Sequence, residues 1–380
     1  REDTKMVSKN IHNYEIDFAP TKDEKSEENI SDLIPLSNNK IGGEDKMKHT
    51  APRNRTLTVS EEELKKMKTR FINLNKQCML DAIKGKVICQ DALECIQFLP
   101  EKSIDLLIID PPYNMYKKFN EVTFNKKTID EYAEWIDSWF SQIVSKISLT
   151  GSVYVCCDWQ SSSAIETVLR KHLIVRNRIT WERDKGRGAK TNWKNCSEDI
   201  WFATKSNKFV FNVDKVKIMR KVIAPYRDEN GDPKDWKETN TGNYRLSHPS
   251  NFWTDITIPF WSMPENTDHP TQKPEKLLAK LILASSNEGD FVFDPFCGSG
   301  STLVVAKKLN REFSGIEIDE YYCALTLKRL DLADIDKSIQ GYSEGLFWER
   351  NSLTEQQKIK LSSRKQKGID NYEIEFDWHH

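Results

Sequence analysis

The stretch that decides the fold is Leu106-Leu107-Ile108-Ile109-Asp110-Pro111-Pro112-Tyr113-Asn114, in which four apolar residues lead into an acid, two prolines and an aromatic residue. An unbroken apolar run that ends at a proline predicts a buried parallel strand. The prolines cannot continue a central strand or a helix interior, so the chain leaves the sheet in a stiff turn. Asp110 and Tyr113 are therefore expected at the carboxyl end of the strand, where open α/β sheets bind ligands. Taken alone, the motif is equally compatible with a structural turn that Asp110 caps.

The composition bounds the class of protein. The chain has 380 residues, 38% hydrophobic and 30% charged, with a mean hydropathy of -0.66, which indicates two or three domains with a normal core and polar tails or insertions. The net charge is -1, so any nucleic-acid surface must be local. The eight cysteines show no C-x-x-C pair and no metal-binding Cys/His spacing, which predicts reduced thiols and no metal. With no secretory leader and no long apolar run, a soluble cytoplasmic protein without a membrane partner is expected.

Strands and helices alternate through two parts of the chain. In the first part, strands are expected at 87–91, 104–109, 152–157 and 174–181, with helices at 93–99, from 128 to about 147, and after 160. In the second part, a helix from Lys273-Pro274 to Ser285, with the proline at its first position, precedes strands at 290–294 and 312–316, each followed by a helix. This alternation predicts an α/β fold, with a doubly wound, mostly parallel sheet between two layers of helices.

The remaining segments differ in composition. Residues 1–60 carry 10 Lys/Arg against 11 Asp/Glu and few apolar residues, which predicts a polar N-terminal arm (1–70), although Ser60 also reads as a helix N-cap. From Asp184 the alternation stops, and residues 181–260 carry 15 Lys/Arg against 11 Asp/Glu, interleaved with aromatic residues. A solvated insertion accounts for the charges, whereas a nucleic-acid surface accounts for both the charges and the aromatics. Residues 341–380 are expected to be a second polar tail.

A second motif follows the strand expected at 290–294. Asp294 leads into Phe296-Cys297-Gly298-Ser299-Gly300 and Thr302, then a helix, a strand and Glu317. Such a βαβ unit binds nucleosides, because its glycines let the backbone approach a ligand and the helix start favours negative groups. Glu317 is placed to accept hydrogen bonds from ribose hydroxyls. The third glycine of dinucleotide sites is missing, which favours a single nucleoside.

Together, Asp110-Pro111-Pro112-Tyr113 and Phe296-x-Gly298-x-Gly300 resemble S-adenosylmethionine-dependent amino-methyltransferases that act on DNA bases. The catalytic motif comes first and the cofactor glycines last, which is similar to the circularly permuted beta group of bacterial modification methylases. The resemblance covers roughly 75–340 and includes Gly151–Tyr154, Trp181 and His269–Pro274. It implies a permuted Rossmann-like methyltransferase fold. Its expected parts are a catalytic half (71–183), a target-recognition insertion (184–265) and an S-adenosylmethionine-binding half (266–340).

The resemblance also implies roles for individual residues. Asp110 and the Pro111 carbonyl accept hydrogen bonds from the target amine, next to Pro112, and Tyr113 stacks on a base flipped from the duplex. The implied cofactor-binding residues are Asp91 at the adenine end, Glu317 at the ribose, Thr271 and Lys273 at the methionine carboxylate, Phe296 packed on the cofactor, and Asp294, Gly298, Gly300 and Thr302 around the turn. For Asp91 and Thr271, capping or turn roles remain open.

These roles predict a DNA adenine-N6 methyltransferase, because the aspartate form of the motif resembles adenine enzymes and cytosine-N4 enzymes usually begin it with serine. The sequence has no Pro-Cys pair of the kind that cytosine-C5 enzymes use as a nucleophile. S-adenosylmethionine is the implied donor, S-adenosylhomocysteine the product, and double-stranded DNA in a bacterial cytoplasm the substrate. The alternatives are cytosine-N4 methylation, a non-catalytic DNA-binding protein with the same fold, and RNA or protein-amide substrates. A homodimer and a cognate restriction endonuclease are partners left open, as is the target sequence.

Overall fold

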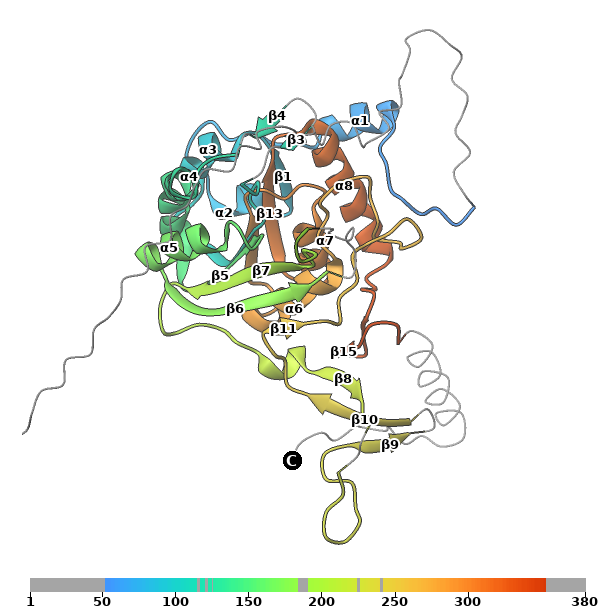
Figure 1. Cartoon of the computed structure of the whole chain (residues 1–380). Coiled ribbons are helices and arrows are strands. Elements are labelled where there is room, and N and C mark those ends of the chain that lie inside the picture. Colours follow the sequence, from blue (N-terminus) through green and yellow to red (C-terminus); the bar gives the residue numbers. More distant parts are fainter. Residues whose placement is uncertain are drawn as a thin grey trace, which may run out of the picture. The chain divides into compact units, whose positions relative to one another are not determined.

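A large central sheet organises the chain in the computed structural model, which describes residues 52–114, 117–119, 122–124, 126–183, 191–223, 226–239 and 242–352. The N-terminal arm up to residue 51 and the tail beyond residue 352 lie outside these ranges. The strands of the central sheet are β1 (Lys86–Cys89), β2 (Ile104–Ile109), β5 (Ile147–Cys157), β6 (Ile174–Glu182), β7 (Ser197–Thr204), β11 (Phe252–Trp253), β12 (Phe291–Asp294) and β13 (Glu312–Glu317). Their spatial order is β1-β13-β12-β2-β5-β7-β6-β11. Figure 1 shows β5, β7, β6 and β11 of this sheet.

Most neighbouring strands in this sheet are parallel. Five strand pairs are parallel, and only β7 runs antiparallel to its two neighbours, β5 and β6. The predicted mostly parallel α/β sheet is therefore confirmed. The permuted order is also visible: β12 comes late in the chain but lies directly beside β2, with Val292 opposite Leu106.

Helices cover both faces of the sheet. Successive residues of a strand point to opposite faces, and the buried strands carry apolar residues on both of them. Leu107 and Ile109 of β2 belong to the core under α3 (Ala92–Cys95), α4 (Ile129–Ile143) and α5 (Ser162–His172). Leu106 and Ile108 belong to the core under α6 (Glu275–Ser285), α7 (Ser301–Lys308) and α8 (Glu320–Ile335). Figure 1 shows the two helix groups on opposite sides of the sheet. The shorter helices are α1 (Glu61–Lys68), α2 (Leu80–Ile83), η2 (Ile96–Phe98), η3 (Val144–Lys146) and η4 (Val213–Val216).

Several predicted elements have different bounds in the structure. Thr128 caps α4 as predicted, but α4 ends at Ile143 and η3 follows, so β5 begins at Ile147. The strand predicted at 87–91 ends at Cys89, because Asp91 Oδ1 accepts a hydrogen bond from Leu93 N and starts α3. Pro274 is the N-cap of α6 and not its first helical residue.

The stretch 184–265, predicted as one insertion, is divided between two sheets. The buried apolar residues of β7, such as Ile200 and Ala203, complete the central sheet between β5 and β6, and β11 extends it. The second sheet, in the order β14-β15-β8-β10-β9, comprises β8 (Ile218–Lys221), β9 (Lys237–Thr239), β10 (Gly242–Ser247), β14 (Tyr342–Ser343) and β15 (Leu346–Trp348). A separate hairpin joins β3 (Lys117–Phe119) to β4 (Val122–Phe124).

Both predicted polar tails extend too far into the fold. At the C-terminal side, Phe347 and Trp348 are buried and β15 pairs with β8, so the tail predicted from 341 is wrong for its first part. At the N-terminal side, Ser60 caps α1 as predicted, and α1 packs on α8. Lys328 Nζ donates to Glu63 Oε1 at 2.6 Å. The arm predicted to reach residue 70 therefore stops before α1.

All eight cysteines are free, as predicted, and five of them are buried. Within the described ranges, no helix has the length and apolar character needed to cross a membrane.

Candidate active site

Four parallel strands end at one edge of the central sheet. Asp110 follows β2, Asp294 ends β12, Glu317 ends β13, and β1 leads into Asp91. Because neighbouring parallel strands run in the same direction, these acids lie along the same edge. Gln90 N donates to Glu317 O across 3.0 Å at the β1 end of this row. The sheet thus brings together two motifs that lie far apart in the sequence.

Asp110 is held by the ammonium group of Lys273. Lys273 Nζ donates to Asp110 Oδ2 at 2.6 Å and to the Tyr113 hydroxyl at 3.0 Å, and only 9% of the Lys273 side chain is exposed. Burial by itself lowers the pKa of Lys273, but the charges of Asp110 and Glu198 outweigh it and raise that pKa above its ordinary value. Lys273 is therefore a cation at neutral pH and fixes one oxygen of Asp110.

The other oxygen of Asp110 is placed differently. Asp110 Oδ1 is buried and has no hydrogen-bond partner within the described ranges. A buried acceptor left without a partner costs about 1–3 kcal/mol. The turn that presents it is rigid, since Tyr132 Oη donates to Pro112 O at 2.9 Å and Asn114 exchanges two hydrogen bonds with Lys127. This turn, with Pro111 buried, therefore offers an open acceptor to a ligand.

Glu198, which the sequence did not single out, belongs to the same cluster. Its Oε2 accepts a hydrogen bond from the Tyr113 hydroxyl at 3.1 Å and lies 3.4 Å from Lys273 Nζ, and its Oε1 lies 2.8 Å from Arg183 Nη1. Burial, together with the charges of Asp110 and Glu198, raises the pKa of Tyr113 well above its ordinary value, so the phenol stays neutral and can donate. The signal in the sequence was an acid at the start of an apolar run in β7.

A cavity beside the turn joins the two motifs. Its lining includes Asp110, Thr271, Lys273, Asp294, Phe296 and Thr302. The sequence assigns Lys273 and Thr271 to one carboxylate, but the Lys273 ammonium contacts Asp110. Thr271 is exposed, and its N–H donates to His269 Nδ1 at 3.3 Å, which is the turn role left open for it. Lys273 therefore lies where the Asp110 turn and this cavity meet.

The turn after β12 depends on two glycines in the left-handed region. Gly298 has φ +53° and Gly300 has φ +76°. A β-carbon at Gly300 would lie 2.3 Å from Thr326 Cγ2, and one at Gly298 would lie 3.0 Å from His269 Nε2. Since both the backbone conformation and the space exclude a side chain, each position requires glycine.

Glu317 closes this glycine turn from the neighbouring strand. Its Oε2 accepts from Gly298 N and its Oε1 from Asp319 N, both at 2.9 Å. Burial raises the pKa of Glu317 to about 7, although these backbone hydrogen bonds act in the opposite direction. The carboxyl group is therefore poised near neutrality beside the glycine backbone.

Asp294 holds the other side of the same turn. Its Oδ2 accepts from Thr302 Oγ1 at 2.6 Å and its Oδ1 from Phe296 N at 3.0 Å. Burial raises the pKa of Asp294 to about 7. Asp294 and Thr302 thus fix the backbone on either side of Gly298 and Gly300.

Phe296 and Asp91 make structural contacts near the cavity. The Phe296 ring packs edge-on against Trp139, with 5.1 Å between the ring centroids. Asp91 caps α3, the role left open for it, and does not line the cavity. The described ranges contain no cluster of three His, Cys, Asp or Glu side chains suited to a metal ion.

The chain belongs to the N6/N4 DNA methylase family, whose model, described as DNA methylase, matches residues 104–328. The match runs from β2 into α8 and includes both motifs. Type II methyltransferase M.HpaI of Haemophilus parainfluenzae is 34% identical over 249 residues, which cover 65% of this chain and 74% of that protein. DNA adenine methyltransferase YhdJ of Escherichia coli (strain K12) is 34% identical over 254 residues, covering 65% and 83%. Among solved structures, the PvuII DNA methyltransferase, described as cytosine-N4-specific, is similar over 70% of this chain and 93% of its own, with 19% identity and a TM-score of 0.48.

Proposed function

We propose that this DNA methyltransferase transfers a methyl group from S-adenosylmethionine to the exocyclic N6 amine of adenine in double-stranded DNA, at a specific sequence. The observation that carries the proposal is the buried, unpartnered Oδ1 of Asp110 beside the cavity that includes Phe296 and Thr302. Membership of the DNA methylase family supports the reaction, and the relative named as a DNA adenine methyltransferase supports adenine as the target base.

Asp110 acts on the amine by position and charge. An exocyclic amine is a poor nucleophile because its lone pair is delocalised into the base. Asp110 Oδ1 accepts a hydrogen bond from the amine, while Oδ2 stays on Lys273 at 2.6 Å, so the carboxylate cannot rotate away. The Pro111 carbonyl supplies a second acceptor. Two acceptors in the plane of the amine localise its lone pair toward the methyl group, and no covalent intermediate is needed.

Tyr113 provides the surface on which the extruded adenine rests. Its hydroxyl is held by Lys273 at 3.0 Å and by Glu198 at 3.1 Å, which limits rotation of the ring. Extruding a base costs a few kcal/mol of stacking, and stacking on an aromatic side chain returns about 1–3 kcal/mol. The ring therefore offsets much of that cost and keeps the amine against Asp110.

The residues around the glycine turn fit S-adenosylmethionine. When bound, this cofactor supplies an electrophilic methyl group on a sulfonium. Gly298 and Gly300 let the turn take its left-handed conformation and pack closely against His269 and Thr326, which shapes the backbone beside the cavity. With the cofactor bound, Glu317 would accept hydrogen bonds from the ribose hydroxyls, and Phe296 would pack against the cofactor.

The remaining cofactor contacts follow the same assignment. Asp91 faces the adenine end from the start of α3, and Thr271 with Lys273 receives the methionine carboxylate. Asp294 and Thr302 keep the turn in shape through their 2.6 Å hydrogen bond. Lys273 then serves both substrates, which ties the position of the cofactor to that of Asp110.

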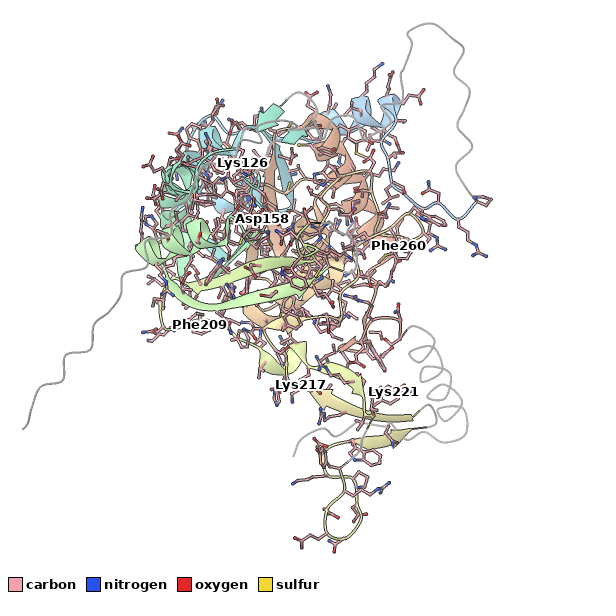
Figure 2. The ribbon with its side chains drawn as sticks, viewed as in Figure 1. Lys126, Asp158, Phe209, Lys217, Lys221 and Phe260 are labelled. Atoms are coloured by element: carbon pink, nitrogen blue, oxygen red, sulfur yellow. The ribbon has the colours of Figure 1, made fainter. Side chains whose placement is uncertain are left out.

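DNA is recognised by the second sheet and its flanking segments. Arg220, Lys221, Arg245 and the exposed Tyr226 line a hollow on this sheet, and Figure 2 shows Lys221 at the end of β8. Asp235 and Glu349 line it too, 3.0 Å from Arg245 and 3.9 Å from Arg220, so Lys221 is the basic residue best placed for a phosphate. Basic side chains neutralise phosphates, and an exposed aromatic ring can stack on a base. The target-recognition region thus comprises the part of 184–265 outside the central sheet, completed by strands β14 and β15. The catalytic half (71–183) and the cofactor half (266–340) flank it in the sequence. The type II names of several relatives make a cognate restriction endonuclease and a second copy of the chain the partners to test, in a bacterial cytoplasm.

Nucleoside mass spectrometry tests the proposal. The full chain is incubated with duplex DNA and methyl-labelled S-adenosylmethionine, and the DNA is digested to nucleosides. The expected product is labelled N6-methyl-2′-deoxyadenosine. This product should be lost with the Asp110→Asn variant. Labelled N4-methylcytosine would overturn the choice of base, and label on RNA or protein alone would overturn the choice of polymer. Sequencing the methylated DNA with modified bases identified gives the target sequence.

A further inference from the structure

Four buried or half-buried charged side chains of alternating sign form a row beside the Tyr113 hydroxyl. Arg183 Nη1 lies 2.8 Å from Glu198 Oε1, Glu198 Oε2 lies 3.4 Å from Lys273 Nζ, and Lys273 Nζ lies 2.6 Å from Asp110 Oδ2. The hydroxyl of Tyr113 bridges the middle pair. The row begins at Arg183, the residue after β6, passes through Glu198 of β7 and Lys273, and ends at Asp110 Oδ2, the oxygen next to the unpartnered Oδ1.

From this row we infer that Glu198 is a positioning residue for methyl transfer, which holds Tyr113 and Lys273 so that Asp110 presents one free oxygen to the target amine. The inference rests on the proposed function, since it assigns Glu198 a part in the same reaction. It concerns a residue outside both sequence motifs, on a strand that the sequence did not predict.

The directions of the hydrogen bonds support this role. Lys273 has only donors, so the Tyr113 oxygen accepts from Lys273 and its single proton must go to another acceptor. Glu198 Oε2 is that acceptor at 3.1 Å. Without Glu198, the Tyr113 proton loses this partner and the ring can rotate about its attachment to the turn.

The charges support it as well. Lys273 lies between two carboxylates, 2.6 Å from Asp110 Oδ2 and 3.4 Å from Glu198 Oε2, so Glu198 shares the ammonium with Asp110. Removing Glu198 leaves Asp110 as the only carboxylate that the structure places against this ammonium. The ammonium then competes with the target amine for the second oxygen of Asp110.

Glu198 is a buried and fully paired acid, and not a solvent-exposed one. Its side chain is 8% exposed, and burying a carboxylate costs several kcal/mol unless it is well paired. Both oxygens are paired, with Arg183 on one side and the Tyr113–Lys273 pair on the other. The backbone that carries it is fixed, since β7 is hydrogen-bonded to strands on both sides.

Asp199, the next residue in β7, gives a matched control. It is similarly buried, with an 11% exposed side chain, but it points to the other face of the sheet. Its oxygens accept hydrogen bonds from Ser162 Oγ and Thr180 Oγ1, each at 2.9 Å. A variant at Asp199 therefore disturbs the same strand without touching Tyr113 or Lys273.

The test measures methyl transfer to duplex DNA by the full chain and four variants: Glu198→Ala, Glu198→Gln, Glu198→Asp and Asp199→Asn. Misplacement of a reacting group by about 1 Å costs about 100-fold in rate, and Glu198→Ala is expected to lower kcat by about that factor. Glu198→Gln still offers an oxygen to the Tyr113 hydroxyl and is expected to recover about tenfold of the loss. The loss of kcat should exceed any change in KM for S-adenosylmethionine, because Lys273 keeps its 2.6 Å hydrogen bond to Asp110 Oδ2. The kcat of Asp199→Asn should stay near the wild-type value.

Three results would overturn the inference. One is wild-type kcat in Glu198→Ala. A second is an equal loss of kcat in Glu198→Ala, Glu198→Gln and Asp199→Asn, because it shows a structural role of the strand. The third applies where Glu198→Ala does not fold: wild-type kcat in Glu198→Asp, which keeps the charge but is one methylene shorter. Wild-type protein is measured first, since its failure to methylate DNA would overturn the proposed function itself and not the Glu198 assignment alone.

Discussion

Lys273 Nζ lies 2.6 Å from Asp110 Oδ2, although the two residues are 163 positions apart in the chain. Asp110 comes from the end of β2, and Lys273 comes directly before α6, much later in the chain. The pairing of β12 with β2 brings the later part of the chain against the earlier part. The proposed active site is therefore built from both parts, and neither part contains it alone.

The first prediction concerns the charge of Asp110. Asp110→Asn keeps the shape of the side chain but loses the carboxylate, and we expect methyl transfer to fall by about 10²–10³-fold or more, as when a charge-stabilising group is removed from an active site. Binding of S-adenosylmethionine, measured by calorimetry, should change little. Asp105→Asn is the control, because Asp105 lies on the same strand and accepts from Phe291 N at 3.0 Å, away from the Asp110 turn. Loss of cofactor binding in Asp110→Asn would place Asp110 outside amine binding.

The second prediction concerns the stability supplied by Lys273. Lys273→Met leaves Asp110 and Glu198 buried without their shared cation, and breaking a buried ion pair in this way costs about 3–5 kcal/mol. Urea unfolding should show a loss of this size. Lys171→Met removes the ion pair between Lys171 and Asp137. Because the Lys171 side chain is 51% exposed, this change should lower the free energy of unfolding by less than about 1 kcal/mol. Equal midpoints for the two variants would contradict the role assigned to the Lys273 pair.

The third prediction separates two effects at the glycine turn. Gly289 has φ +83°, and a β-carbon added there would have free space around it. Gly289→Ala should therefore lower the stability only by the strain of the left-handed conformation, about 1–2 kcal/mol. Gly300→Ala adds a contact of 2.3 Å with Thr326 Cγ2 and should cost clearly more. It should also weaken S-adenosylmethionine binding, which Gly289→Ala should not. If the two variants lose equal stability and both bind the cofactor normally, the turn is not a tight cradle.

The fourth prediction is a pH dependence that arises from Asp294. Burial raises the pKa of Asp294 to about 7, so the folded protein retains a proton that the unfolded chain releases near pH 4. The stabilising contribution is complete below about pH 4 and is lost as pH rises to about 7. Over this range, the free energy of unfolding of the wild type should fall relative to that of Asp294→Asn. Parallel pH profiles for the two proteins would show that Asp294 titrates normally.

The fifth prediction concerns the proposed DNA surface. Lys221→Ala should weaken binding to duplex DNA of any sequence, and the slope of log affinity against log salt should become shallower by about 1. Fluorescence anisotropy at several salt concentrations measures this slope. Lys84→Ala, which removes a cation paired with Asp81 far from the second sheet in sequence, is the control. An unchanged slope in Lys221→Ala would remove Lys221 from the phosphate contacts.

Features that depend on neighbouring residues could be predicted from the sequence. The apolar run of β2 and its proline turn have a single reading, because proline blocks both continued strand and helix. The same holds for Gly298 and Gly300, whose place between a strand and a helix fixes the turn. Helix caps such as Thr128 and Asp319 can also be found from the sequence, because the capping residue and its partner are a few positions apart.

Features that depend on distant pairing could not be predicted in this way. The sequence before β7 has no helical pattern, so the apolar run of β7 does not reveal that it inserts between β5 and β6. The role proposed for Glu198 depends on its hydrogen bond with Tyr113, which is 85 positions away in the sequence. The position of Lys273 depends on how closely α6 approaches the turn after β2, and the sequence carries no signal for that distance.

The second sheet has a consequence for how the protein is made. β8 acquires its neighbour β15 only from residues more than a hundred positions further on, where Phe347 pairs opposite Ile218. A ribosome adds about 5–20 residues each second, so one edge of β8 stays open for several seconds or more after its synthesis. An open strand edge is a template for pairing with other chains. The nascent protein therefore passes through a period in which this edge is open to pairing with other chains.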